Sequence, residues 1–409
     1  MPARSLRITL VIHSLNGGGA ERQITSLAHH LADNSMLCTL MTLDHPGHDR
    51  YAVDPRVKRI GLDAMNSSRS VFESIRANRK RILALRQAIQ ESQPDCVVSF
   101  CDKMNIVALA ACHPLSVPIV ISERSDPRQQ NLGWLWEAAR RWQYPRCSAC
   151  VVQTAGVAKY LRPILGNKKK IEIIPSAIDP PLEQEAHKRK PVSELSKNSD
   201  ASPKILETQA TASQSNGNKR LLYVGRLSYE KGPDRLLQAW STLAAKHPSW
   251  KLSFIGDGPL ESQLKHRCHE LSLDNQVEFL GWQEDVWSHL YQSQAFVLPS
   301  RYEGFPGALI EAMYARLPIV TTNCSDSIFE MIDHKRNGLV AENTSESLTA
   351  TLDQLMSNES LQHQLGFAAG DKAMRYVWQL IGLRWIRMIE ATAKPNYIAE
   401  GDDEAATKR

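Results

Sequence analysis

Two glutamates, Glu303 and Glu311, lie eight positions apart in the stretch SRYEGFPGALIEAM. The preceding AFVLPS has the short apolar run of a buried strand, and Pro306 suits the start of a helix. We therefore predict a strand, then a tight turn that carries Glu303, then a helix that carries Glu311 on its second turn. Strand ends next to such turns are where α/β proteins bind ligands, and carboxylates there can accept hydrogen bonds from hydroxyl groups.

Two cations precede these glutamates, in the stretch LLYVGRLSYEKGPDRLLQAW. Arg226 follows a strand-like run, and Lys231 comes five residues later, before a helix that Pro233 can start. Arginine offers a planar fork and lysine a mobile point charge, so the two together can stabilise the charge of a departing diphosphate. Taken alone, the pair also fits two surface cations on an exposed turn.

Three glycines, Gly17, Gly18 and Gly19, follow the first strand-like run, in HSLNGGGAERQITSLAHHL. They let a ligand approach the backbone closely, and the next helix points its N–H groups and positive dipole end at the same place. This is typical of a phosphate or sugar site, although such a turn also fits dinucleotide binding or plain packing of helix on strand. The chain has no Gly-x-Gly-x-x-Gly, which argues against a dinucleotide.

The elements that position these residues alternate between strand and helix along the chain. The strand-like runs are ITLVIHSL, LCTLMTL, DCVVSF, PIVIS, ACVVQT and IEIIPS in the first half and RLLYVGRL, KLSFIGDG, VEFLGW, AFVLPS, LPIVTT and GLVAEN in the second. Residues 180–219 are polar and rich in Ser, Lys and Asn, so they cannot bury enough apolar area to fold alone. We predict an α/β protein of two Rossmann-like domains, residues 1–179 and 220–395, with a linker or disordered insertion at 180–219 and a charged, disordered tail at 396–409.

The composition is that of an ordinary globular protein, since 42% of the 409 residues are hydrophobic and 23% are charged. No stretch approaches eighteen apolar residues, and the opening RITLVIHSL lacks a leader pattern, so we expect a cytoplasmic protein that does not span a membrane. The eight cysteines are scattered. The one close pair, Cys147 and Cys150, lacks the further ligands that a zinc site needs, so we expect free thiols.

Positive charge is concentrated in the first 180 residues, which hold 24 Lys and Arg against 15 Asp and Glu, a net +9, whereas the remaining 25 against 29 give −4. Two segments there combine basic and apolar side chains. Residues 76–90 surround an apolar stripe with Arg79, Lys80, Arg81 and Arg86, and residues 131–146 interleave three tryptophans with arginines. Both fit an anionic lipid surface, and both also fit ordinary amphipathic helices packed on a sheet.

The order and spacing of Arg226, Lys231, FIGDGPL, FLGW and EGFPGALIEAM, with NGGGAER at the front, resembles glycosyltransferase family 4. These are retaining, nucleotide-sugar-dependent enzymes of the GT-B fold, in which two Rossmann-like domains enclose a ligand cleft. The resemblance covers nearly the whole chain apart from the insertion and the last dozen residues, and it is strongest from Leu221 to Val340.

The resemblance implies a role for each matching residue. Arg226 and Lys231 would hold the donor diphosphate, Glu303 would contact the donor sugar, and these three would be catalytic. Glu311 would accept hydrogen bonds from the ribose hydroxyls. The other donor-binding residues would be Phe305, Gly307, Ala308 and Leu309 at the turn and helix start, with Gly18 and Gly19 closing over the diphosphate from the other domain.

The chain departs from the family pattern near the turn, where Pro306 lacks an N–H and Gly307 stands at a position that often holds asparagine. We therefore expect contacts to the donor sugar that differ from the family pattern, which leaves the identity of the donor open. The chain has no Asp-x-Asp, so we expect no metal and no cofactor besides the nucleotide sugar as co-substrate. The resemblance also implies attack from the leaving-group side, with the departing phosphate taking the acceptor proton.

The acceptor is expected on the first domain, where Glu123 and Arg124 end a strand in VISERSDP and would face the cleft. We assign His13 and His113 structural roles. The sequence, with this resemblance, thus predicts a retaining hexosyltransferase that moves a sugar from a UDP-linked or other nucleoside-diphosphate donor to a saccharide or lipid-linked saccharide acceptor in cell-surface polysaccharide assembly. We also expect peripheral contact with the inner face of the cell membrane and no nucleic acid partner. The alternatives are a transferase for a soluble acceptor and a non-catalytic sugar-nucleotide-binding protein.

Overall fold

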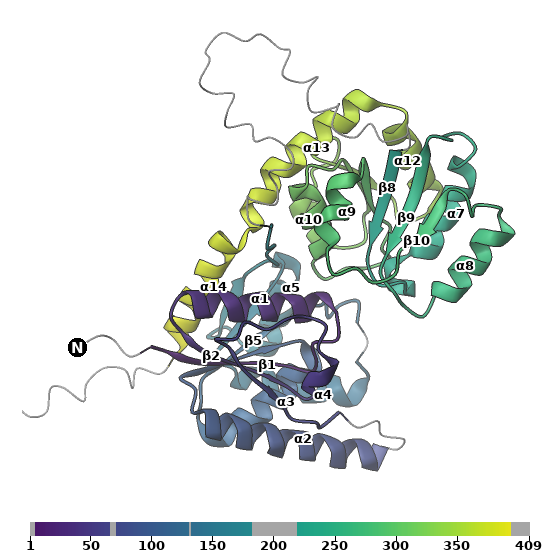
Figure 1. The fold of residues 1–409 in the computed structure, drawn as a ribbon. Helices are drawn as coiled ribbons and strands as arrows, with labels where there is room; N and C mark the ends of the chain where they lie inside the picture. The colour runs from purple at the N-terminus through teal and green to yellow at the C-terminus, as the bar shows by residue number, and fades with distance from the viewer. Residues whose placement is uncertain (1–4, 66–70, 131, 182–218, 394–409) are drawn as a thin grey trace, which may run out of the picture. The chain divides into compact units, whose positions relative to one another are not determined.

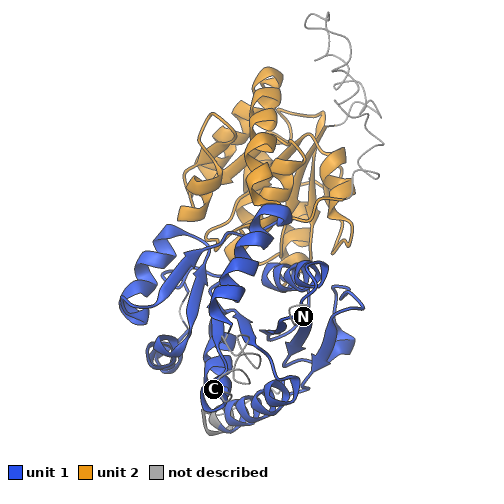
Figure 2. Cartoon of the chain, turned by 90° about the vertical axis from the view of Figure 1, so that its left-hand side faces the viewer, with its two compact units in different colours: residues 1–177, 378–409 blue, residues 178–377 orange. Residues whose placement is uncertain are grey.

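The computed structural model describes residues 5–65, 71–130, 132–181 and 219–393. The chain forms two compact units, one of residues 1–177 with 378–409 and the other of residues 178–377 (Figure 1; Figure 2). Each unit has its own sheet, with a hydrophobic core on either side of it. The predicted division of the chain into two α/β domains is confirmed at this level.

Within its described residues, the first unit has a parallel sheet of seven strands in the order β3-β2-β1-β4-β5-β6-β7. Adjacent residues of β1, such as Leu10 and Val11, are fully buried in different cores, so both faces of the sheet are covered. The strands are β1 (Arg7–Ile12), β2 (Leu37–Thr42), β3 (Lys58–Gly61), β4 (Cys96–Phe100), β5 (Ile119–Ser122), β6 (Ala149–Val152) and β7 (Lys170–Ile173). The helices are α1 (Gly19–Asp33), η1 (Pro46–His48), α2 (Val71–Ser92), α3 (Asp102–Cys112), η2 (His113–Leu115), α4 (Trp134–Gln143), η3 (Tyr144–Arg146), α5 (Ala155–Leu165) and α14 (Trp378–Thr392).

The second unit has, among the residues described, a parallel sheet of six strands in the order β10-β9-β8-β11-β12-β13. All six strand-like runs predicted in this half of the sequence are strands. They are β8 (Lys219–Val224), β9 (Trp250–Ile255), β10 (Val277–Phe279), β11 (Ala295–Leu298), β12 (Ile319–Thr322) and β13 (Leu339–Ala341). The helices are η7 (Tyr229–Lys231), α7 (Pro233–Leu243), α8 (Glu261–Glu270), α9 (Val286–Gln292), α10 (Gly307–Tyr314), α11 (Asp326–Met331), α12 (Ser345–Met356), α13 (Glu359–Ala373) and η8 (Met374–Tyr376).

Each sheet reverses its strand order once, between β1 and β4 in the first unit and between β8 and β11 in the second. Loops that leave the two central strands at such a point run in opposite directions and open a crevice at the carboxyl edge. The glycine loop follows β1, and Arg226 follows β8. The fold therefore places the sequence motifs at the two positions where parallel sheets bind ligands.

The boundary of the second domain differs from the predicted 220–395, because α14 belongs to the first unit. Trp378, Ile381 and Trp385 of this helix lie in the core of the first unit, and the Trp385 ring stacks on Phe100 with centroids 5.5 Å apart. Arg384 also donates to the carbonyl of Ile173. The aromatic face of α14 thus completes the first core, and residues 182–218 of the predicted insertion and the tail from 394 lie outside the described residues.

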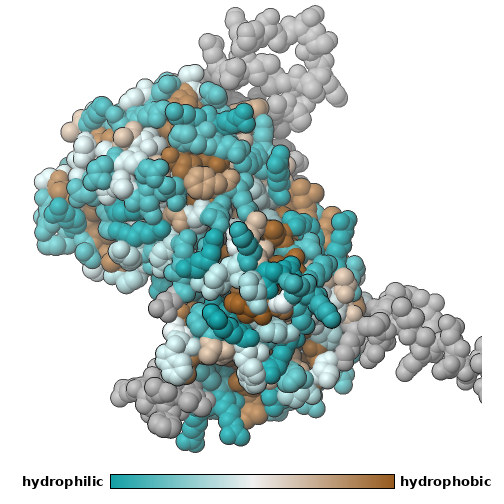
Figure 3. All heavy atoms as spheres, turned by 180° about the vertical axis from the view of Figure 1, so that it is seen from behind, coloured by the Kyte–Doolittle hydropathy of each residue, from teal (hydrophilic) through white to brown (hydrophobic). Residues whose placement is uncertain are grey.

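The surface seen in Figure 3 is mostly hydrophilic, and its hydrophobic side chains gather in small patches. Among the helices that the structure describes, none has both the length and the hydropathy needed to cross a membrane.

Candidate functional site

Lys231 and Glu303, 72 residues apart in the chain, lie in direct contact at the β8/β11 reversal of the second unit. Lys231 Nζ donates to both carboxylate oxygens of Glu303, at 2.9 Å to Oε1 and 2.7 Å to Oε2. Ser300 Oγ also donates to Oε1, at 2.6 Å. Glu303 is buried, whereas Lys231 is partly exposed and can reach a ligand while its partner stays in place.

Arg226 lies at the same edge, directly after β8, with its side chain exposed. Its backbone is fixed, because Tyr223 Oη donates to the Arg226 carbonyl at 2.8 Å. Burial raises the pKa of Tyr223 well above its usual range, so this hydroxyl stays a donor. The arrangement presents an exposed guanidinium on a turn that this hydrogen bond holds in place.

Glycines let the loops at this edge touch backbone to backbone. Gly232 has φ +65°, and a Cβ on it would lie 2.2 Å from the Pro299 carbonyl oxygen. Gly256 has φ +125°, and a Cβ there would lie 2.1 Å from the carbonyl oxygen of Gly225. Side chains at either position would push apart the loops that carry Arg226, Lys231 and Glu303.

Helix α10 begins directly after the Glu303 loop, and no side chain caps its first turn, where Pro306 is the N-cap residue. A Cβ on Gly307 would meet no atom within 4 Å, so the helix start is open to a ligand. Ala308 is partly exposed, whereas the side chains of Phe305 and Leu309 are buried in the core. These last two can therefore reach a ligand only through their backbone.

Glu311 lies on α10, as predicted, and its side chain is buried like that of Glu303. The two carboxylates belong to different elements. Glu303 lies in a loop, where Lys231 binds it, and Glu311 lies on helix α10. Ser300, which fixes Glu303, was not predicted, although its position three residues before the glutamate on the same turn is visible in the sequence.

In the first unit, Gly18 and Gly19 lie at the start of α1, with Gly18 as the N-cap residue. A Cβ on Gly18 would lie 2.2 Å from Glu21 Oε2, whereas one on Gly19 would meet no atom within 4 Å. Glu21 Oε1 lies 3.3 Å from His13 Nε2. The absence of a side chain at Gly18 thus makes room for Glu21, which was not among the predicted site residues.

The prediction that Glu123 faces a cleft is wrong, because its side chain is fully buried. Side chains alternate between the two faces of β5, and Glu123 points to the same face as Ile119 and Ile121, into the core that contains Tyr144. The Tyr144 hydroxyl donates a hydrogen bond to Glu123 Oε1. Arg140 Nη2 of α4 lies 3.9 Å from the same oxygen and is equally buried. Burial raises the pKa of Glu123 to about 7, despite Arg140. Arg124 points to the opposite face, above the Phe100 ring.

The two basic segments of the first unit are helical, but only part of their charge is available to a partner. Arg79 and Lys80 of α2 are exposed, whereas Arg81 donates to the Ala64 carbonyl and Arg86 to the Ala110 carbonyl. On α4 the exposed face holds Trp134, Leu135, Arg141 and Trp142, with the two tryptophans 77% and 65% exposed. We call these four residues the α4 face.

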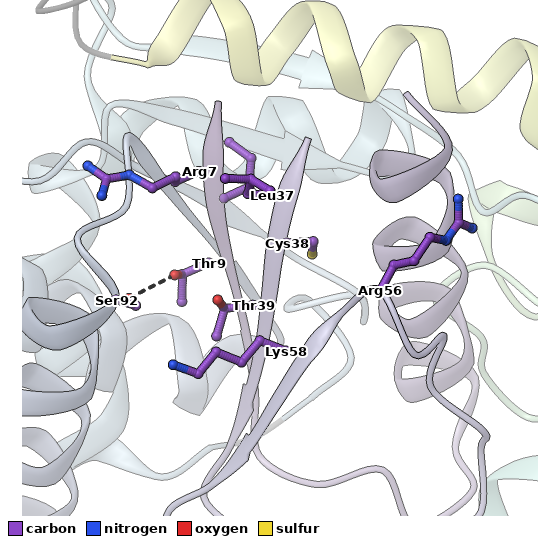
Figure 4. Close-up of a pocket in the computed structure, with 9 residues that line it drawn as sticks. Arg7, Thr9, Leu37, Cys38, Thr39, Arg56, Lys58 and Ser92 are labelled. Atoms are coloured by element: carbon purple, nitrogen blue, oxygen red, sulfur yellow. Dashed lines mark hydrogen bonds between the residues drawn. The ribbon is translucent and has the colours of Figure 1, made fainter. Parts of the chain in front are cut away.

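A cavity of about 200 Å³ lies among the amino-terminal halves of β1, β2 and β3, where Arg7, Thr39 and Lys58 contribute to its lining and Thr9 bonds to Ser92 (Figure 4). It is at the opposite ends of the strands from the motifs, and none of the predicted site residues lines it. We assign it no role. Among the described residues, no three His, Cys, Asp or Glu side chains gather as metal ligands would.

Two family models match consecutive parts of the chain. "Glycosyltransferase Family 4" matches residues 17–181, and "Glycosyl transferases group 1" matches residues 207–371. The solved structure of Anabaena HepE in complex with UDP and glucose superimposes with a TM-score of 0.69 at 16% identity, over 94% of this chain and all of that one. The chain is a GT-B glycosyltransferase.

Two curated relatives of this GT-B glycosyltransferase are named for the sugar that they transfer. One is the Campylobacter jejuni GalNAc-alpha-(1->4)-GalNAc-alpha-(1->3)-diNAcBac-PP-undecaprenol alpha-1,4-N-acetyl-D-galactosaminyltransferase, 25% identical over 94% of this chain and 98% of that protein. Another is the lipopolysaccharide 1,6-galactosyltransferase of Salmonella typhimurium, 32% identical over 35% of this chain and 42% of that one. The predicted GT-B fold and transferase class are thereby confirmed.

Proposed function

We propose that this enzyme is a retaining hexosyltransferase of family 4 that binds a nucleoside-diphosphate sugar, UDP-linked, on its second unit. The observation that carries the proposal is the contact of Lys231 with Glu303 beside Arg226, at the strand reversal of that unit. A cation pair for a diphosphate and a buried carboxylate for a sugar hydroxyl lie together there. The complex of a structural neighbour with UDP and glucose supports the choice of donor.

Each residue then has a chemical role. Arg226 and Lys231 bind the diphosphate and stabilise the charge that develops as the bond from C1 to the phosphate oxygen breaks. Glu303 accepts a hydrogen bond from the sugar, Glu311 accepts hydrogen bonds from the ribose, and the first N–H groups of α10 bind the sugar or the phosphates. The acceptor oxygen bonds to C1 on the face that the phosphate leaves, and its proton passes to the departing phosphate. No metal takes part in this scheme.

The acceptor that we propose is a lipid-linked saccharide of cell-surface polysaccharide assembly, reached at the inner face of the cell membrane. The name of the Campylobacter relative, whose acceptor ends in PP-undecaprenol, supports this choice. The α4 face supports it as well, because two exposed tryptophans beside an arginine suit a lipid interface.

The direct test is a donor screen with the purified enzyme, in which release of the nucleoside diphosphate is followed with UDP-, GDP- and ADP-linked hexoses. We expect release from a UDP-sugar, unchanged by EDTA, and a product with the anomeric configuration of the donor by NMR. Activity lost with EDTA and recovered with magnesium or manganese would overturn the metal-free scheme. Tight binding of UDP without any turnover would instead indicate a non-catalytic binding protein.

The Glu311→Gln variant is expected to bind the free nucleoside diphosphate about tenfold more weakly, because the amide loses charge-assisted hydrogen bonds to the ribose but keeps the side-chain volume. Calorimetric titration measures this affinity directly. Glu346→Gln, an exposed carboxylate of α12 in the same unit, is the control and should bind like the unchanged enzyme. Equal affinities for the Glu311 variant and this control would count against the ribose assignment.

Sedimentation with lipid vesicles tests the membrane contact. We expect the enzyme to bind anionic vesicles at low salt and to dissociate at high salt, because charge attraction of about 1 kcal/mol per basic residue is screened within about a Debye length. Replacing both Trp134 and Trp142 by serine should abolish binding. The matched control is the Phe367→Ser variant. Phe367 is an exposed aromatic residue of the second unit, and Arg316 lies over its ring as Arg146 lies over the ring of Trp142.

If the unchanged enzyme stays in the supernatant with anionic vesicles at low salt, the membrane contact is disproved and a soluble acceptor becomes the better proposal. Zwitterionic vesicles should bind poorly in either case.

A further inference from the structure

Arg124 is a partly buried cation at the carboxyl edge of the first sheet, and its printed contacts are with neutral groups. Its Nη2 donates to Ser176 Oγ at 2.9 Å. The Gln153 amide, oriented so that both of its ends are bonded, accepts from Nη2 at 3.1 Å and donates to the Arg124 carbonyl at 3.0 Å. The guanidinium carbon lies 4.9 Å from the centre of the Phe100 ring.

The charge of Arg124 has no carboxylate to balance it. Among the described residues, no Asp or Glu forms an ion pair with it, since Glu123 faces the other core with Arg140 and Asp126 binds Arg128 at 2.6 Å. Arg124 Nε is buried with no hydrogen-bond partner in the described part of the chain. Burial lowers the pKa of Arg124 to about 10, as expected for a guanidinium that is partly withdrawn from water without a carboxylate beside it.

Arg124 and the three groups around it come from four neighbouring strand ends. Phe100 ends β4, Arg124 follows β5, Gln153 follows β6 and Ser176 follows β7. The carboxyl edge of a parallel sheet is where α/β proteins bind ligands. What the site lacks is one negative charge, and the planar fork of arginine matches two oxygens of a phosphate.

We propose that Arg124, positioned by Ser176 and Gln153, binds a phosphate group of the acceptor. The inference rests on the proposed function, because it requires an acceptor that carries a diphosphate. The other source of the same chemistry is the diphosphate of the donor, which we have assigned to Arg226 and Lys231. If Arg124 binds the acceptor, each unit binds one anion: the donor diphosphate on the second unit and the acceptor phosphate on the first. The experiments below distinguish the acceptor phosphate from the donor diphosphate as the ligand of Arg124.

The binding test does not depend on turnover. The full chain is saturated with UDP to fill the donor site, and inorganic pyrophosphate is then titrated while the unfolding temperature is measured. Arg124→Met removes the charge and keeps the volume, and the bond between Ser176 and Gln153 remains. Arg128→Met is the matched control, because it removes the same charge from a nearby arginine that is already paired with Asp126.

In the unchanged chain and in the Arg128 variant, pyrophosphate should raise the unfolding temperature, as any ligand of the native state does. The Arg124 variant should need about ten times more pyrophosphate for half of the shift. An equal response in both variants would overturn the site. A loss of UDP affinity in the Arg124 variant would overturn the acceptor assignment, since the anion would then belong to the donor.

A kinetic measurement identifies the phosphate-bearing substrate. With a short-chain polyprenyl diphosphate saccharide as acceptor, Arg124→Met should raise KM about tenfold or more, whereas KM for the same saccharide without phosphates should not change. An equal rise for both acceptors would overturn the proposal. A chain that transfers no sugar at all fails the donor screen and disproves the proposed function, while the pyrophosphate titration still decides whether Arg124 binds an anion.

Discussion

The Lys231→Ala variant is expected to turn over more slowly than the unchanged enzyme by a factor on the order of a hundred or more. Two losses combine in it. The diphosphate loses a cation that stabilises the developing charge, and Glu303 loses the partner that contacts both of its oxygens. Rates with the best donor of the screen measure the effect, and near-normal turnover would disprove the assignment.

A second variant separates these two losses. Lys231→Ala combined with Glu303→Gln leaves no buried, unpaired carboxylate, so it should regain the unfolding temperature of the unchanged enzyme but not its turnover. Lys246→Ala is the matched control, because Lys246 is an exposed lysine of the same unit that also pairs with a carboxylate, Asp353. The Lys246 variant should have the same unfolding temperature and turnover as the unchanged enzyme within experimental error.

The Arg140→Ala variant is expected to lower the free energy of unfolding of the first unit by about 3–5 kcal/mol, because it breaks a buried ion pair and leaves Glu123 without a counter-charge. Urea denaturation followed by circular dichroism measures this. Arg141→Ala, the next residue and an exposed one, should change the free energy of unfolding by no more than about 0.5 kcal/mol. Similar values for both variants would contradict the role of the buried pair.

The pH dependence follows from the raised pKa of Glu123, about 7 against an ordinary 4.5. The native state holds this proton more tightly than the unfolded chain, so the contribution of Glu123 is fully favourable below about pH 4.5 and is lost as the pH rises to about 7. The Arg140→Ala variant should therefore recover part of its stability at pH 5. Glu123→Gln should remove this component of the pH dependence, and an unchanged slope would show that another group titrates.

The sequence predicted the sheets well because both faces of a parallel sheet are buried, and its strands are then continuous apolar runs. β3 was missed because Lys58–Gly61 is an edge strand whose sequence, KRIG, contains one aliphatic side chain and so makes no apolar run. The motifs also placed Arg226, Lys231 and Glu303 at strand ends, where a parallel fold brings them to one edge. Their roles in binding and transfer stay predictions.

Other features depend on long-range packing that no local pattern reveals. Alternation in β5 shows that Glu123 and Arg124 point to opposite faces, but not that α4 and Tyr144 bury the glutamate. The apolar face of α14 is also visible in the sequence, but no local pattern near Trp378 indicates whether this face packs on the first unit or on the second. The charge that α2 offers to a partner was likewise overestimated, because two of the four basic residues named there, Arg81 and Arg86, bind carbonyls contributed by other segments.

The return of α14 to the first unit has a consequence for synthesis on the ribosome. The first unit lacks the core residues Trp378, Ile381 and Trp385 until nearly the whole chain has been made. At about 5–20 residues per second, the interval between residue 177 and the end of α14 is about 10–40 s. The second unit, which is continuous in sequence, can fold within that interval. We therefore expect the second unit to complete its folding before the first, the reverse of the order of translation. Until then the face that α14 covers is the surface that a chaperone would meet.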